Sequence, residues 1–542
     1  VRLVGLWALA FLVAGLVGAA QLLPTVRILD VAVRGGTGES GYAFASSWAL
    51  PFQELSALFL PDLIGSLGTY WGANPFKLHT EHLGAVPLAL AAIALTGFRR
   101  DARVAVIASI ALICVAFALG SATPVHRIAY YVVPFVKQFR APSMMLGPAS
   151  LMVALLAGLG WQRVLSARDG ERPIPWAWVI GIIAPLLLFA LAAAWSPSGL
   201  QRWVRTTWFP DGWTRQAPLD PAAALRANGW FLLVGLGATV GAAWAVARKR
   251  APVWIVACLL VILVADQWRV DTRYLRTVDA AGLFPVDPVV VGLQEEMETA
   301  ERSFLAPGAT TYGPGELAVH RIASVTGIQK FRLEWYERFT GGLGMTNMGS
   351  LSALGLLDVA FIVANPGLTS ELLTSVADSE RGTAYRVEVN PPHAFFPGSV
   401  EAVTDTADAL RRVLSSDPLQ LAVVETPEAP PAGAGSARIA SYEPNEIVLD
   451  VEATRSGLLF LSEVYYPAWR AWIDDVETPV LRTNVAFRGV EVPTGRHEVV
   501  HRYSPSDFRI GFLVSGTTAA IVVAWLLVGA FRGRRRPAGA EV

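Results

Sequence analysis

Long apolar runs recur along this chain. About 20 mostly apolar residues are needed to cross a lipid bilayer as an α-helix. Runs that reach or approach this length occupy residues 3–24, 83–98, 104–120, 145–165, 176–195, 229–247, 252–268 and 509–531. The pattern predicts an α-helical polytopic membrane domain with about eight transmembrane helices, seven of them within residues 1–268.

Short basic segments predict the orientation of these helices, because Lys and Arg accumulate on the cytoplasmic side of a membrane. Basic clusters lie in residues 99–103, 163–172, 248–250 and 532–542. Strict alternation of the eight helices puts all four clusters, including the basic C-terminal tail, in the cytoplasm. The segments then expected outside the cytoplasm are 25–82, 121–144, 196–228 and 269–508. Within them, residues 52–64 and 126–139 are amphipathic, and we expect them to lie along the membrane surface.

The longest outside segment changes its pattern at residues 429–435, where APPAGAG is typical of a linker. Before the linker, residues 407–414 have helical spacing and 419–424 read as a strand, so we predict an extracytoplasmic α/β region over 269–429. After it, alternating strands are expected at 446–453, 457–463, 479–484, 486–492 and 496–503. These strands predict a C-terminal antiparallel β-sandwich over 436–508.

The composition supports a chain surrounded by lipid. It is 53% hydrophobic and only 16% charged, and its 44 basic and 44 acidic residues cancel, so it has no global attraction to nucleic acid. Cys114 and Cys258 lie in apolar runs and predict no disulfide framework. The numbering begins at Val1, from which we expect a fragment; residues 3–24 also resemble a signal peptide, but their length favours a retained helix.

Three groups of polar residues are candidates for chemistry at the outer membrane boundary. Lys137 and Arg140 precede the fourth run, where they predict either phosphate binding or interfacial anchoring. His79, Glu81 and His82 precede the second run; they predict a polar rim, a metal site or an ordinary helix entrance, and further ligands at metal-binding spacing are lacking.

Asp266 lies near the end of the seventh run, where an ionisable group is costly unless it is paired or functional. Arg269 and Arg273, at i+3 and i+7, are expected to share its helical face. The alternatives for Asp266 are a structural ion pair with these arginines and a catalytic or lipid-gating role.

The C-terminal segment 461–515 resembles the closing module of the bacterial YfhO family of membrane proteins. The matching residues are Tyr466, Pro467, Trp469, Trp472, Asn484, Phe487, Pro493, Gly495, His497 and Tyr503. Upstream, LLDVAFIVANP at 356–366, ASVTGIQKFRLEWYERF at 323–339 and FRAPSMML at 139–146 are also similar to family segments. Ile328 stands where that family has a tyrosine, and Met144 where it has a second arginine.

The resemblance implies a multi-spanning, GT-C-like glycosyltransferase of the bacterial plasma membrane. Such an enzyme takes a sugar from a polyprenyl-phosphate donor and attaches it, outside the cytoplasm, to a cell-envelope polymer such as teichoic acid. The resemblance also implies a catalytic acid in the first outside loop, which we expect upstream of Val1; Glu81 and Asp266 are the candidates within the chain. No cofactor is predicted, and the use of a divalent metal is left open.

Two other functions fit the same pattern. One is a transporter or flippase for a glycolipid, although the chain has no internal repeat of the kind common in transporters. The other is a non-catalytic envelope scaffold or receptor that uses the large outside domain. Trp469, Trp472 and Tyr466 lie in predicted strands, and we expect them in the core of the sandwich rather than on a sugar-binding surface.

Overall fold

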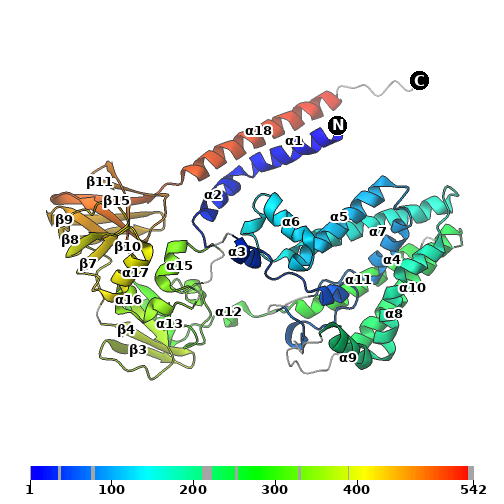
Figure 1. The fold of residues 1–542 in the computed structure, drawn as a ribbon, viewed down its shortest axis with the longest axis horizontal. Helices are drawn as coiled ribbons and strands as arrows, with labels where there is room; N and C mark the ends of the chain where they lie inside the picture. Colours follow the sequence, from blue (N-terminus) through cyan, green and yellow to red (C-terminus); the bar gives the residue numbers. More distant parts are fainter. Residues whose placement is uncertain are drawn as a thin grey trace. The chain divides into compact units, whose positions relative to one another are not determined.

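The computed structural model describes residues 2–33, 38–74, 80–209, 222–250, 254–327, 331–342, 344–388 and 390–534. The chain divides into two compact units (Figure 1). The helical unit spans Gly35–Val278. The mixed unit combines Val1–Arg34 with Asp279–Val542, so that both ends of the chain contribute to it.

The helical unit is built around α4 (Ala85–Leu95), whose small apolar residues are almost all buried. It packs against α5 (Ala102–Ala118), α7 (Leu146–Arg168), α8 (Trp176–Trp195) and α10 (Ala222–Ala247). The approach to α7 is close, because a Cβ added at Gly160 would lie 1.9 Å from the carbonyl oxygen of Leu90. The remaining helices are α3 (Gly38–Ala45), α6 (Pro124–Val132), α9 (Pro197–Trp208) and α11 (Trp254–Asp271).

The segment between α3 and α4 is folded into this unit. Its 3-10 turn η1 (Phe52–Leu58) is followed by Leu60, Leu63 and Ile64, each at most 1% exposed in a core shared with α8, α9 and α10. The predicted surface position of residues 52–64 is therefore wrong for their second half. These apolar side chains gain more by burial among helices than they would at the membrane interface.

All eight predicted spans contain helix. Among the described residues, four helices are long and apolar enough to cross a membrane: α7 with its preceding turn, α8, α10 and α18 (Ser506–Arg534). The helices α4 and α5 are apolar but shorter. The chain is thus a membrane protein with several apolar helices, and the count of eight spans stays a prediction.

The first predicted span is two helices rather than one. α1 (Arg2–Val17) and α2 (Ala19–Leu29) are bent by 79° at Gly18, which favours the break because glycine has a low helix propensity. In the mixed unit, α18 lies alongside both helices (Figure 1). Gly511 allows this contact, because a Cβ there would lie 2.5 Å from the carbonyl oxygen of Ala19.

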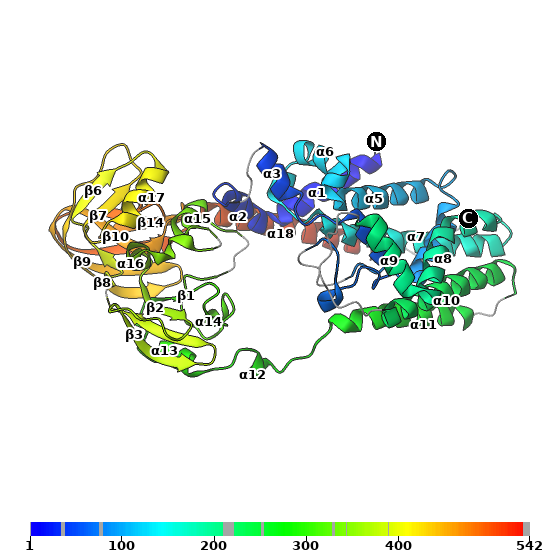
Figure 2. The ribbon, with the colours of Figure 1, turned by 60° about the horizontal axis from the view of Figure 1, so that its bottom comes forward.

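The predicted α/β region holds a four-stranded sheet in the order β1-β2-β4-β3. Its parallel pair is β1 (Arg302–Leu305) and β2 (Val359–Ala364), and β4 (Gly382–Val387) and β3 (Leu373–Ser379) extend it in antiparallel fashion. Helix α13 (Pro288–Glu296) packs against β3 (Figure 2). The other helices of this part are α12 (Ala280–Leu283), α14 (Glu316–Val319), α15 (Glu334–Thr340), α16 (Leu351–Leu356) and α17 (Thr406–Ser415).

Two further sheets complete the mixed unit, and they share one hydrophobic cluster. The six-stranded sheet has the order β5 (Ala394–Phe395), β10 (Gly457–Val464), β14 (Phe487–Val492), β13 (Leu481–Thr483), β7 (Leu421–Val424) and β6 (Ser399–Ala402). The five-stranded sheet has the order β12 (Val476–Thr478), β11 (Trp469–Ile473), β15 (Gly495–Tyr503), β9 (Glu446–Arg455) and β8 (Ala434–Glu443).

The five predicted C-terminal strands are confirmed as β9, β10, β13, β14 and β15, and the predicted helix and strand before the linker as α17 and β7. The linker does not separate the sheets, however. β7, from before it, pairs with β13, from after it, at Val424 and Thr483. Residues 436–508 alone therefore do not make both sheets. Such pairings between distant segments leave no periodic signal in the sequence.

Candidate functional site

Polar side chains from four segments, most of them buried, meet in the helical unit. We call them the Asp62–Asp266 cluster. Its members are Asp62, His82, Asn228, Asp266, Arg269 and Arg273. Asp62 follows η1, His82 precedes α4, Asn228 lies in α10, and the others lie at or just after the end of α11. Charged groups at helix ends in a membrane protein are costly to bury, so their arrangement demands either mutual pairing or a function.

Asp266 is 3% exposed and has three partners. Its Oδ2 lies 3.2 Å from Nε2 of His82 and accepts a 3.1 Å hydrogen bond from the backbone N–H of Ala85, at the start of α4. Its Oδ1 accepts from Arg269 at 3.2 Å, which confirms the predicted i+3 pairing. Gly84 permits the start of α4 to lie close to α11. Its φ of +86° favours glycine, and a Cβ there would lie only 2.6 Å from the Gln267 side chain on α11.

Asp62 is 4% exposed and forms the other half of the cluster. Arg273 donates to both of its carboxylate oxygens, at 2.6 and 2.8 Å, and Asn228 donates to Oδ2 at 2.6 Å. Arg269 in turn donates to Asn228, so this amide connects the two carboxylates. The predicted i+7 pairing of Arg273 with Asp266 is wrong. Because α11 ends at Asp271, Arg273 lies in a 3-10 turn and reaches Asp62 instead.

The cluster is accessible mainly through Arg273, whose side chain is 34% exposed while that of Asp62 is 6% exposed. Tyr274 lies next to it and donates a 2.8 Å hydrogen bond to Ser66. Burial raises the pKa of Tyr274, and the negative charges of Asp62 and Glu81 raise it further, so this phenol remains a neutral donor. Glu81 itself is half-buried. An anion that approached the cluster would meet Arg273 first.

An apolar cavity of about 320 Å³ lies among α4, α5, α7 and α8. Leu58 and Leu83 line it, and the backbone N–H of Leu83 donates to the carbonyl oxygen of Leu58 at 2.9 Å. Leu83, which lines the cavity, directly follows the cluster member His82 in the chain. The helical unit therefore contains charged groups and an apolar cavity, the two kinds of surface that a phospholipid-like molecule requires.

Two other predicted site residues, Arg140 and Lys137, lie outside this cluster. The Arg140 guanidinium carbon lies 4.0 Å from the ring centroid of Trp48, and Lys137 is exposed. Ala141 adopts a left-handed conformation, with φ of 62°, and so confirms the predicted turn before Pro142. His79 lies outside the described residues. Among the described residues, no group of three or more His, Cys, Asp and Glu side chains is placed to hold a metal ion.

Sequence reasoning missed Asp62 and Asn228. Asp62 belongs to a stretch that was read as surface-bound, and Asn228 immediately precedes the predicted sixth span. Each is a single polar residue next to an apolar segment, which is a weak signal when its partner is 166 positions away in the chain. Only the folded chain brings them within hydrogen-bond distance.

A second buried charged group lies in the mixed unit around Glu463. This carboxylate contacts Arg302 at 2.5 Å, Arg488 at 3.0 Å and His393 at 3.3 Å. Although burial opposes its ionisation, the two arginines and His393 hold the pKa of Glu463 well below its usual range. The contacts join β10 to β1 and β14, so we assign this group a structural role.

Comparisons with known proteins bear on the sheets and on the whole chain. Residues 434–515 match the family model described as bacterial membrane protein YfhO, over β8 to β15 and the start of α18. A search of curated proteins found no match. A similar solved structure is that of the arabinofuranosyltransferase AftD from mycobacteria, with 15% identity and a TM-score of 0.23. The alignment covers 91% of this chain and 51% of that chain, so this chain spans about half of that protein's length. The match over residues 434–515 confirms the predicted resemblance of the C-terminal segment to the YfhO family of bacterial membrane proteins.

Proposed function

We propose that this chain belongs to a membrane glycosyltransferase that transfers a sugar from a polyprenyl-phosphate carrier to a cell-envelope polymer, such as teichoic acid, on the outer face of the plasma membrane. The observation that carries the proposal is the Asp62–Asp266 cluster: two buried carboxylates, each held by an arginine, in a unit that also contains an apolar cavity. The resemblance of residues 434–515 to the YfhO family agrees with it. The C-terminus and the basic loops are assigned to the cytoplasm in this proposal.

Sugar transfer from a lipid phosphate needs a base for the acceptor hydroxyl and donors for the leaving phosphate. Arg273 is the accessible guanidinium, and its planar fork binds two oxygens of a phosphate as readily as those of a carboxylate. A phosphate that binds Arg273 competes with Asp62 for the N–H groups of its guanidinium. Asp62 is then free to accept the proton of the acceptor hydroxyl.

The other members of the cluster have positioning roles in this proposal. Asp266 keeps three partners, so it orients Arg269 and His82 rather than serving as the base. The prenyl chain occupies the apolar cavity that begins at Leu58 and Leu83. Arg140 and Lys137, which lie outside the cluster, are assigned to bind phosphate at the membrane surface; the ring of Trp48 supports the Arg140 guanidinium.

A glycolipid flippase and a non-catalytic scaffold are the competing functions, and one experiment separates all three. The natural protein is reconstituted in liposomes with a radiolabelled polyprenyl-phosphate sugar and an envelope polymer as acceptor. A glycosyltransferase moves the label into the polymer. Label that only changes leaflet would assign a flippase, and label that does neither would assign a scaffold; each of these results contradicts the proposal.

A further inference from the structure

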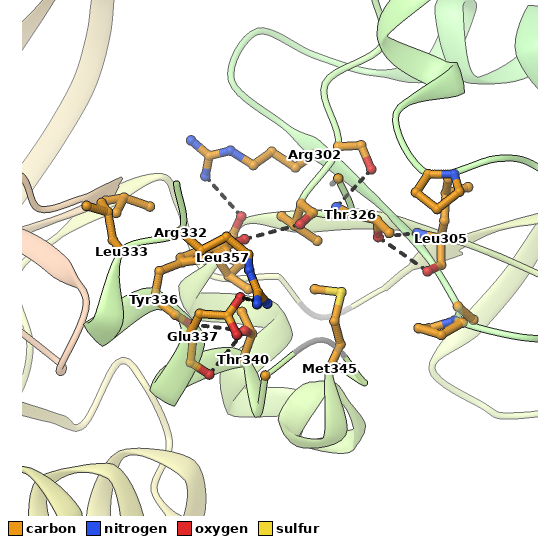
Figure 3. Close-up of a pocket in the computed structure, with 18 of the residues that line it drawn as sticks. Arg302, Leu305, Thr326, Arg332, Leu333, Tyr336, Glu337, Thr340, Met345 and Leu357 are labelled. Atoms are coloured by element: carbon orange, nitrogen blue, oxygen red, sulfur yellow. Dashed lines mark hydrogen bonds and ion pairs between the residues drawn. The ribbon is translucent and has the colours of Figure 1, made fainter. Parts of the chain in front are cut away.

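A pocket with a volume of about 660 Å³ lies wholly within the mixed unit (Figure 3). Its wall comes from the end of β1, the loop that follows β1, the segment 324–327 and helix α15. Pockets of about 300–1,000 Å³ hold small-molecule ligands. The volume therefore admits a ligand of two or three linked rings.

The charged residues that line this pocket are compensated by neighbours. Arg302 donates to Glu463 and to the carbonyl oxygens of Leu357 and Ser462, and Arg332 pairs with Glu337. Figure 3 shows the Arg332–Glu337 pair in the wall of the pocket. An ionised ligand would have to displace one of these ion pairs. The pocket consequently favours a neutral ligand.

The remaining polar lining consists largely of hydroxyl groups that share one arrangement. Each donates to a backbone carbonyl group: Thr310 to Arg381, Ser324 to Ser303, Thr326 to Leu305, Tyr336 to Val325 and Thr340 to Tyr336. A hydroxyl oxygen has two lone pairs, and within the described part of the chain none of these oxygens accepts more than one hydrogen bond. Burial raises the pKa of Tyr336 to about 12, so this phenol is neutral as well. The wall therefore presents a series of acceptors to a ligand rich in O–H donors.

Apolar surface lies between these hydroxyls. Pro307, Met345 and Val464 contribute aliphatic atoms, and Phe331 and Tyr336 contribute half-buried aromatic rings. A saccharide combines the same features: it is neutral, it donates hydrogen bonds from many hydroxyls, and its C–H faces pack on aromatic and aliphatic groups. A pure lipid chain would make no hydrogen bonds to the remaining lone pairs of these hydroxyl oxygens.

From these features we propose that the pocket is a binding site for a neutral saccharide of two or three residues. The site goes beyond the proposed transfer chemistry, because its residues belong to the other unit and its occupancy needs no catalysis. It gives the mixed unit a ligand-binding role in addition to its structural one.

Gly327 offers a direct test. It lines the pocket, and a Cβ added there would meet no atom within 4 Å, so Gly327→Phe adds a bulky ring at the wall of the pocket without a clash at its Cβ. Gly349 is the matched control, because a Cβ there also meets nothing within 4 Å and the residue does not line the pocket. The whole chain is placed in nanodiscs, free of glycoside detergents, and titrated calorimetrically with maltotriose, mannotriose, galactotriose, arabinotriose and the anionic trigalacturonate.

At least one neutral trisaccharide should bind saturably to the parent and to Gly349→Phe, and at least about tenfold more weakly to Gly327→Phe. If Gly327→Phe does not fold, Tyr336→Phe decides, because it keeps the ring but removes one acceptor and should weaken binding several-fold. The proposal is overturned if none of the four neutral sugars binds the parent, if trigalacturonate binds best, or if the decisive variant binds like the parent.

Discussion

At the scale of single residues, Asn228 shows how the candidate site depends on the fold. Its side chain accepts from Arg269 and donates to Asp62, so one amide links the two carboxylates of the cluster. The sequence identified Asp266 and His82 because each stands out at the end of an apolar run. It did not identify Asp62 or Asn228, whose importance lies in partners that are distant along the chain.

His501 predicts a pH dependence of stability in the mixed unit. It is fully buried in β15, and neither ring nitrogen has a hydrogen-bond partner among the described residues. Burial, with the nearby charge of Arg488, lowers the pKa of His501 to about 3. The unfolded chain therefore binds this proton first, and the folded state loses stability as the pH falls from about 6.5 towards 3.

We expect about 2 kcal/mol less stability of the mixed unit at pH 5 than at pH 7 from this residue alone. Glu463 does not contribute in this window. The lowered pKa of Glu463 stabilises the folded state at neutral pH, and this stability is lost only as the pH falls below the ordinary carboxylate pKa of 4.5. His501→Phe should flatten the dependence. Thermal unfolding of the whole protein, followed by the β-sheet signal in circular dichroism, measures it; an unchanged slope in His501→Phe would show that another group titrates.

At the scale of secondary structure elements, the apolar runs predicted the positions of the helices well, because a segment surrounded by lipid must be apolar and must satisfy its backbone hydrogen bonds within itself as a helix. They failed at residue 18, where the helix breaks, and at residues 60–64, where apolar residues are buried among helices rather than at the membrane surface. Alternation predicted the C-terminal strands, but it could not predict the addition of β7 to the sheet through Val424 and Thr483.

The contact between α4 and α7 provides a test of element packing with an internal control. A Cβ at Gly160 would overlap the carbonyl group of Leu90, whereas one at Gly158 meets nothing within 4 Å. Alanine has a higher helix propensity than glycine by about 1 kcal/mol, so Gly158→Ala should leave stability equal or higher. Gly160→Ala should instead lower the temperature of unfolding by several degrees, because overpacking costs about 1–3 kcal/mol.

Size-exclusion chromatography of heated, detergent-solubilised protein would compare these two variants. The prediction requires that the two substitutions, two residues apart on one helix, change the temperature of unfolding in opposite directions or by clearly unequal amounts. Equal shifts for the two alanine variants would mean that α4 and α7 are not packed at Leu90 as described.

At the scale of the whole molecule, the basic loops and the long hydrophilic segment between α11 and α18 predicted a membrane protein with one large water-exposed part. The structure has both the apolar helices and three sheets, and the exposure of the sheets to water outside the cytoplasm stays a prediction. The N-terminal helices nonetheless belong with the C-terminal sheets in the mixed unit. The sequence order could not predict this, because helices α2 and α18 pack across almost the full length of the chain.

We assign the role of proton acceptor to Asp62, within this chain, rather than to the residue expected upstream of Val1. Asp62→Asn retains the shape and the contact with Asn228 but removes the basic group. Asp169→Asn is the matched control, because Asp169 is exposed at the end of α7 and takes no part in the cluster.

The most direct test is single-turnover transfer of labelled sugar from polyprenyl phosphate by the natural protein, with polyprenyl-phosphate binding measured in parallel. Loss of a general base typically costs about 10²–10⁴-fold in rate. Asp62→Asn should therefore transfer at least about 100-fold more slowly than the parent and Asp169→Asn while it still binds the lipid phosphate. Transfer by Asp62→Asn at the rate of the parent would contradict the assignment and place the base outside the Asp62–Asp266 cluster.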